Sequence, residues 1–179
     1  PRTADLGYEE QGIKLERGFV TVDQNLHTGV GNIYAAGDIV PGLQLAHRGF
    51  AQGIFLAEHI AGLDPVPVDE KGIPRVTFCE PEIASVGLTE KQAKEEFGED
   101  KVKATAGFIK LVSVEDGPIV GYHALGARIG EQVGEGELII NWEAYPDDVA
   151  NLIHAHPTQN EAVGEAAMAL AGKPLHSHN

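Results

Sequence analysis

The sequence has little cysteine, little positive charge and no long hydrophobic run, and each shortage excludes a class of protein. Its 179 residues include one cysteine, Cys79, so the chain alone cannot form an intramolecular disulfide or exchange a dithiol for a disulfide. Lys and Arg number 13 against 27 Asp and Glu, and a net charge of −14 repels the phosphates of nucleic acids and anionic lipids. No apolar run approaches the roughly 20 residues of a membrane-spanning helix. The sequence therefore predicts neither nucleic-acid binding nor a membrane span.

What remains is typical of a globular protein, with 42% hydrophobic and 22% charged residues. The first residues, 1–5, contain neither an initiator methionine nor a signal sequence, so we expect the chain to begin inside a longer protein. Residues 63–74 hold three prolines and four charged residues without any periodicity, which indicates a domain boundary. We place this boundary near Val68, giving domains of residues 1–68 and 69–179.

The first domain has one stretch that predicts a ligand site. Residues 33–36 form a short apolar run typical of a buried parallel strand, and Gly37 and Asp38 follow it directly. In open α/β sheets, ligands bind at the carboxyl ends of the strands. A helix is predicted over 45–61, with Phe50 and Ile54 on its packed face. Its free N–H groups would suit an electron-rich carbonyl or an anion, and Asp38 could accept hydrogen bonds from hydroxyls, although Gly-Asp is often only a turn.

The second domain alternates between strand and helix patterns. Strands are predicted at residues 75–79, 83–87, 107–112 and 119–125, and helices at 90–97, 127–142, 146–153 and after Thr158. Thr89 and Gln92 have the spacing of a capping box at the start of the first of these helices. This order predicts a mixed α+β domain with a helical carboxyl-terminal third.

The strongest candidate for a catalytic site is the segment from His154 to Glu161. Pro157 restricts the chain after His156, and Glu161, five residues later, lies close enough to accept a hydrogen bond from the imidazole. A carboxylate in this position sets the tautomer of a general acid or base. An alternative remains open, because Thr158 and Glu161 also have the spacing of a capping box, in which Glu161 would only satisfy backbone donors.

Other side chains favour structural roles. A metal site at His154 and His156 would lack a third Cys or His ligand at suitable spacing. His176 and His178 are expected to lie in a mobile terminal tail, which does not favour a metal site there either. Cys79 is expected to be a buried structural thiol on a strand. The acidic run at 131–137 is expected to be a solvated helix face.

Four motifs, in the same order, resemble the carboxyl-terminal part of the dihydrolipoamide dehydrogenase family, flavin-dependent disulfide reductases of 2-oxo acid dehydrogenase complexes. They are NIYAAGD at 32–38, LAH at 45–47, TFCEPEIASVGLTE at 77–90 and HAHPTQNEAVGE at 154–165. The His-x-His-Pro-Thr-x-x-Glu-Ala form is more similar to lipoamide dehydrogenase than to glutathione reductase, which is the nearest alternative within this chemistry.

The resemblance implies a fold and cofactors. Residues 1–68 would be the end of an NAD domain and the last segment of a Rossmann-like FAD domain, and residues 69–179 an α+β dimerisation domain with an antiparallel sheet and flanking helices. Gly37 and Asp38 would lie at the ribityl chain of FAD. Leu45, Ala46 and His47 would place a helix start against the flavin pyrimidine.

The resemblance also implies a reaction and partners. His156 would be the acid/base that moves a proton to and from the dithiol, Glu161 would orient it, and the His156 turn would reach the other subunit of a homodimer. The parent enzyme would oxidise dihydrolipoamide carried by an acyltransferase of the complex, using FAD and NAD, in the bacterial cytoplasm or the mitochondrial matrix.

Two departures from the family pattern accompany these expectations. The redox cysteine pair and the FAD-phosphate glycine loop would lie upstream, so we expect this chain alone to be inactive. Residues 101–107 are also shorter than the family usually shows. A non-catalytic dimerisation or docking module is therefore the alternative function.

Overall fold

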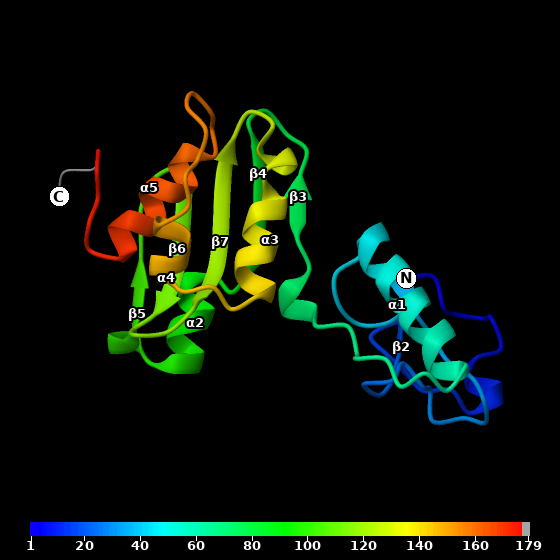
Figure 1. Cartoon of the computed structure of the whole chain (residues 1–179). Helices are drawn as coiled ribbons and strands as arrows, with labels where there is room; N and C mark the ends of the chain where they lie inside the picture. Colours follow the sequence, from blue (N-terminus) through cyan, green and yellow to red (C-terminus); the bar gives the residue numbers. More distant parts are fainter. Residues whose placement is uncertain (177–179) are drawn as a thin grey trace. The chain divides into compact units, whose positions relative to one another are not determined.

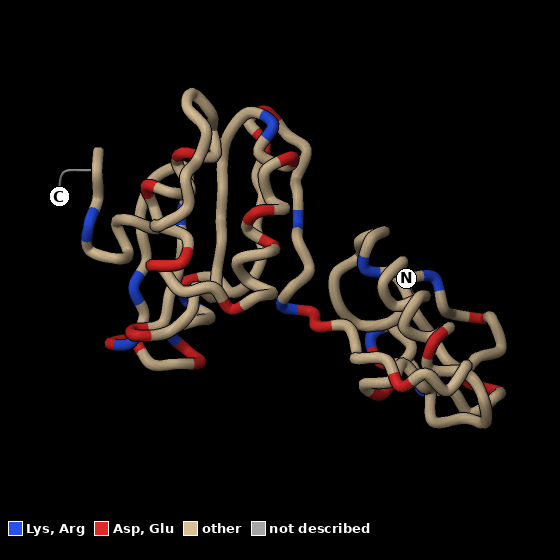
Figure 2. The backbone as a smooth tube through the Cα atoms, in the orientation of Figure 1, with Lys and Arg blue, Asp and Glu red and all other residues tan. Residues whose placement is uncertain are grey.

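The structure, a computed structural model, describes residues 1–176 and divides into two compact units, Pro1–Glu70 and Lys71–Asn179 (Figure 1). The division falls inside the proline-containing segment 63–74. Asp and Glu positions are distributed over both units, as Figure 2 shows. Within residues 1–176, no helix is both long and apolar enough to cross a membrane.

The first unit has little regular structure apart from one helix. Its elements are the 3-10 turns η1 (Glu9–Gln11) and η2 (Gly37–Ile39), the paired strands β1 (Leu15–Glu16) and β2 (Phe19–Val20), and helix α1 (Ala46–Ile60). The strand predicted at residues 33–36 is wrong. A strand requires a paired neighbour, and the backbone here makes only an isolated antiparallel bridge between His27 and Tyr34.

Helix α1 occurs where it was predicted, but its packed face is not the predicted one. The buried residues are Arg48, Gln52 and Phe55, whereas Phe50 and Ile54 are 70% and 62% exposed. The apolar periodicity identifies a helix, but it does not say which side this unit covers. The polar pair Arg48 and Gln52 is buried because backbone groups of the same unit satisfy its hydrogen bonds.

The second unit is built on a five-stranded antiparallel sheet with the order β3-β4-β7-β6-β5. The strands are β3 (Arg75–Thr77), β4 (Glu82–Gly87), β5 (Val102–Ala104), β6 (Ile109–Val114) and β7 (Ile119–Gly126). Four of them match the predicted strands within a few residues. The short edge strand β5 was not predicted, because three residues are too few to distinguish a strand from a loop by their alternation.

Four helices accompany the sheet, namely α2 (Glu90–Phe97), α3 (Val133–Asn141), α4 (Pro146–Ala150) and α5 (Glu161–Leu170). The capping box predicted for α2 is present, with Thr89 and Gln92 bonding each other's backbone. The single helix predicted over 127–142 is wrong. Arg128 has a left-handed φ of 55° and is followed by a 3-10 turn, η5 (Ile129–Glu131), so the α-helix begins only at Val133.

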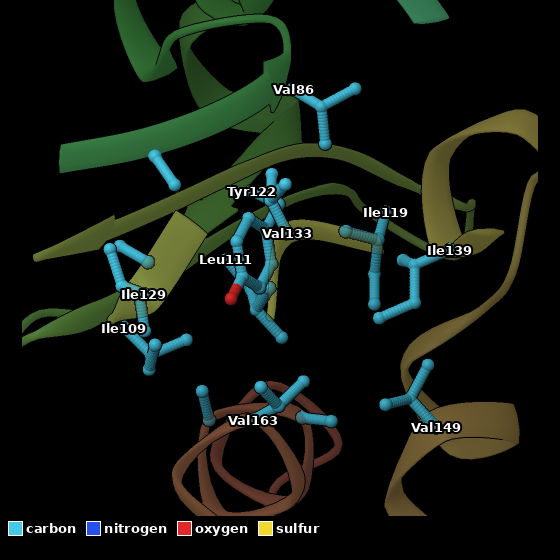
Figure 3. Close-up of a cluster of buried hydrophobic side chains, with 14 residues drawn as sticks. Val86, Ile109, Leu111, Ile119, Tyr122, Ile129, Val133, Ile139, Val149 and Val163 are labelled. Carbon is cyan, nitrogen blue, oxygen red and sulfur yellow. The ribbon is translucent and has the colours of Figure 1, made fainter. Parts of the chain in front are cut away.

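The core of the second unit lies between one face of the sheet and helices α3, α4 and α5. Val86, Leu111 and Tyr122 are directly paired across neighbouring strands, so their side chains share this face, and Val163 of α5 packs opposite them (Figure 3). The Tyr122 hydroxyl is buried without a hydrogen-bond partner among the described residues. Burial, together with the charge of Glu135, raises the pKa of Tyr122 to about 12.

Two glycines of α3 differ in the space around them, which shows how closely this helix approaches the sheet. A Cβ at residue 136 would lie 2.6 Å from Cγ of Tyr122, whereas a Cβ at residue 134 would meet nothing within 4 Å. We expect Gly136→Ala to lower the free energy of unfolding by about 1–3 kcal/mol through overpacking. Gly134→Ala should raise it by about 0.5–1 kcal/mol, because alanine favours the helix. Urea denaturation of both variants measures the difference, and equal effects would contradict the close packing.

Candidate functional site

His156 lies in the segment that connects α4 to α5, seen as the orange loop in Figure 1. The His156–Pro157 peptide bond is cis. Within this turn, Oγ1 of Thr158 donates a hydrogen bond to the carbonyl of Ala155 at 2.6 Å. The imidazole is thus displayed on a short turn immediately before α5, with 83% of its side chain exposed.

Glu161 contacts both the imidazole and the backbone of the turn. Nδ1 of His156 lies 2.9 Å from Oε1 and 3.2 Å from Oε2 of Glu161. The N–H of Thr158 donates to Oε2 at 2.9 Å. Both contacts that the sequence suggested for Glu161 are therefore present, since one carboxylate binds the ring and satisfies a backbone donor. Only this half of a capping box forms, because the Thr158 hydroxyl bonds Ala155 instead.

This arrangement favours the ionised form of Glu161. The Thr158 N–H, and after it the imidazole, lower the pKa of the Glu161 carboxyl. An ionised carboxylate can only accept hydrogen bonds, so Nδ1 of His156 carries a hydrogen, and in the neutral ring the lone pair is then on Nε2. Nε2 can therefore take a proton from a group outside the turn and return it.

A second His–Glu pair contacts this turn and is more buried than the first. Nε2 of His154 lies 2.7 Å from Oε1 of Glu135, and Nδ2 of Asn160 donates to Oε2 of Glu135 at 2.5 Å. The expectation that residues 131–137 form a solvated acidic face is wrong for Glu135, whose side chain is only 20% exposed. No local signal could have shown this, because its two partners follow 19 and 25 residues later along the chain.

The other candidate side chains do not gather into a site. Among residues 1–176, no group of three or more His, Cys, Asp or Glu side chains could hold a metal ion. Nδ1 of His176 lies 2.7 Å from Oε1 of Glu165, and His178 lies outside the described residues. The expectation of a buried Cys79 is wrong. Strand β3 ends at Thr77, so this thiol lies beyond it and is exposed.

In the first unit, Gly37 and Asp38 form the turn η2, and α1 begins eight residues later at Ala46. Asp38 is exposed. Leu45, in an extended conformation, is the N-cap residue of α1, and its side chain makes no cap hydrogen bond. Leu45, Ala46 and His47 thus lie at a helix start, as predicted.

Side chains of helix α1 also form hydrogen bonds with the backbone of the Gly37 turn. Oε1 of Gln52 accepts a hydrogen bond from the N–H of Gly37 at 2.7 Å. Arg48 donates to the carbonyls of Gly37 and Pro41, and its Nε lies 2.8 Å and 2.9 Å from the two carboxylate oxygens of Glu70. These buried polar bonds fix the backbone that carries Asp38.

The His156–Glu161 contact can be tested through the titration of Glu161. We expect His156→Gln to raise the pKa of the Glu161 carboxyl toward its ordinary value without reaching it, because the Thr158 N–H still donates. Carboxyl 13C NMR measures this pKa, and His59→Gln in the first unit is the control. An unchanged titration would mean that the ring does not bond the carboxylate in solution.

The same lowered pKa predicts the sign of a stability effect. The ionised Glu161 stabilises the fold above the ordinary carboxyl pKa, near 4.3, and this contribution is lost as the pH falls through the lower folded pKa. Over that range, the melting temperature of the natural chain should fall more steeply with decreasing pH than that of Glu161→Gln.

Comparisons with known families match most of the chain. Residues 73–105 and 100–167 match the dimerisation domain of the pyridine nucleotide-disulphide oxidoreductases, and residues 1–53 match the pyridine nucleotide-disulphide oxidoreductase family. The two pieces of the dimerisation match overlap at residues 100–105.

Individual relatives are similar to this chain over nearly all of its length. Dihydrolipoyl dehydrogenase of Bacillus subtilis (strain 168) is 44% identical over 193 aligned residues, which cover 98% of this chain and 41% of the relative. The protein of the same name from Corynebacterium glutamicum is 39% identical over 191 residues, covering 96% and 41%. The chain thus spans about two fifths of the length of these relatives.

Solved structures agree with this assignment. LpdA from Mycobacterium tuberculosis superimposes with a TM-score of 0.84 at 26% identity, over 95% of this chain and 40% of that one. The HOCl-induced flavoprotein disulfide reductase RclA from Escherichia coli superimposes with a TM-score of 0.81 at 24% identity, over 93% and 42%, a likeness of fold alone. The resemblance inferred from the four motifs is confirmed, and the chain belongs to the pyridine nucleotide-disulphide oxidoreductase family.

Proposed function

We propose that this chain supplies the acid/base turn, the dimer interface and part of the FAD site of a dihydrolipoyl dehydrogenase. The observation that carries the proposal is the His156–Glu161 pair, with Nδ1 bonded to the carboxylate at 2.9 Å and the ring otherwise exposed. The relatives named dihydrolipoyl dehydrogenase, at 39–44% identity, support this choice of activity.

His156 would act on protons in this reaction. Oxidation of a dithiol to a disulfide releases two electrons and two protons, and NAD takes up both electrons with one proton. His156 would accept a thiol proton at Nε2, and Glu161 would stabilise the resulting imidazolium at Nδ1. The redox cysteine pair would lie outside this chain, whose single cysteine is Cys79.

The residues of the first unit fit a flavin. The start of α1, at Leu45, Ala46 and His47, would place the positive end of the helix dipole against a carbonyl of the flavin ring. Asp38, exposed on the turn held by Gln52, can accept hydrogen bonds from the ribityl hydroxyls. When bound, FAD supplies the two-electron carrier between the dithiol and NAD.

The partners of the protein follow from the same proposal. The match to a dimerisation domain over residues 73–167 supports a homodimer, in which the His156 turn would serve the other subunit. The dithiol would be carried by the lipoyl-bearing acyltransferase of a 2-oxo acid dehydrogenase complex.

The activity is testable in a chimera in which this chain replaces the matching part of the Bacillus subtilis relative. We expect His156→Gln to slow dihydrolipoamide oxidation by about 10²–10⁴-fold, the usual contribution of a general acid/base. Reduction of ferricyanide by NADH should be unchanged, because it needs no proton transfer at a dithiol. Full lipoamide activity in the variant would instead favour a role in dimerisation or docking. Faster reduction of glutathione disulfide than of lipoamide would point to a glutathione reductase.

The flavin site has its own test in the same chimera. We expect Asp38→Ala to weaken FAD binding by about tenfold or more, since hydrogen bonds to charged groups contribute about 1.5–3 kcal/mol. Asp64→Ala, also exposed in the first unit, removes the same charge and should leave FAD binding unchanged. Flavin absorbance of the dialysed protein measures the bound fraction, and equal losses in both variants would remove Asp38 from the site.

A further inference from the structure

The carboxylate of Glu135 contacts the chain on both sides of the His156 turn. Oε1 lies 2.7 Å from Nε2 of His154, two residues before His156, and Oε2 accepts from Nδ2 of Asn160 at 2.5 Å, where α5 begins. We propose that Glu135 is the positioning residue that fixes the turn carrying His156.

The burial of these groups strengthens the two hydrogen bonds of Glu135. The side chains of Glu135 and His154 are 20% and 12% exposed, so water competes weakly for the carboxylate. The His154 ring lies directly on Gly164 of α5, where an added Cβ would come within 2.7 Å of Nδ1. His154 therefore has little room to move away from Glu135.

Glu135 is itself held by the core of the unit. The next residue, Gly136, packs on the ring of Tyr122 in the centre of the sheet. Gln132, at the N-cap of α3, donates a hydrogen bond to the side chain of Gln159 in the turn. Helix α3 is thus held against the sheet at Gly136, and its side chains at Gln132 and Glu135 bond the segment around His156.

The same bonds also position Glu161. Asn160 is the N-cap of α5 and Glu161 is its first residue, so fixing Asn160 fixes the start of the helix that carries the orienting carboxylate. Glu135 would therefore influence both members of the His156–Glu161 pair without touching either one. Its consequence for catalysis rests on the function proposed above, whereas its effect on the turn does not.

The first experiment measures the turn itself in the 179-residue chain. Glu135→Gln keeps the size of the side chain, but a carboxamide cannot accept hydrogen bonds on both sides. We expect amide exchange of Thr158, whose N–H bonds Glu161, to become about tenfold faster by NMR, since local opening controls exchange of such groups. Glu137→Gln, on the exposed side of the same helix, removes the same charge and should change the rate less than about twofold.

A second variant keeps the test valid if Glu135→Gln fails to fold. Asn160→Ala removes only one of the two bonds to Glu135 and leaves its contact with His154 in place. It should also accelerate exchange of Thr158. Unchanged exchange in every folded variant would overturn the proposal.

The catalytic consequence is measured in the chimera. We expect Glu135→Gln to lower kcat for dihydrolipoamide by about 10-fold to 100-fold, the effect of a small misplacement of a catalytic group, while ferricyanide reduction stays unchanged. Equal losses in both reactions would mean a general structural defect and would overturn the positioning role. If His156→Gln leaves lipoamide turnover intact, the proposed function fails, while exchange at Thr158 still decides whether Glu135 fixes the turn.

Discussion

Helix α3 lies close to the sheet because residue 136 is a glycine that accommodates the ring of Tyr122. This contact fixes the helix from which Glu135 reaches His154 and Asn160. Those bonds in turn fix the chain on both sides of His156. The most buried aromatic side chain of the unit and its exposed imidazole are thus connected by a short series of direct contacts.

Two carboxylates, each accepting two hydrogen bonds, hold the irregular backbone around His156. Glu135 accepts from His154 and Asn160, and Glu161 accepts from His156 and the Thr158 N–H. A turn lacks the repeating backbone bonds of a helix or strand, so its geometry depends on such side chains. The acidic composition therefore has a structural use here beyond its contribution to net charge.

The features that the sequence predicted correctly are those that depend on near neighbours. The capping box at Thr89 and the closeness of His156 to Glu161 follow from spacings of three and five residues. Several of the errors concern burial, which depends on distant parts of the chain. Cys79 was expected inside and Glu135 outside, and the buried face of α1 proved to be polar at Arg48. In each case, the deciding partner or neighbour is not visible in the local pattern.

Because the His156 ring is exposed, its position depends on contacts made by the turn that carries it and not on packing over the ring. In the function that we propose, the imidazole exchanges protons with a group on another chain, so Nε2 has to stay open and packing over the ring would block its use. Precise placement then depends on bonds made by the backbone and by the side chains flanking the ring. Glu161 provides such a bond at Nδ1, and Glu135 provides bonds at both ends of the turn. A fixed turn with an open imidazole would suit the proposed proton transfer between two chains.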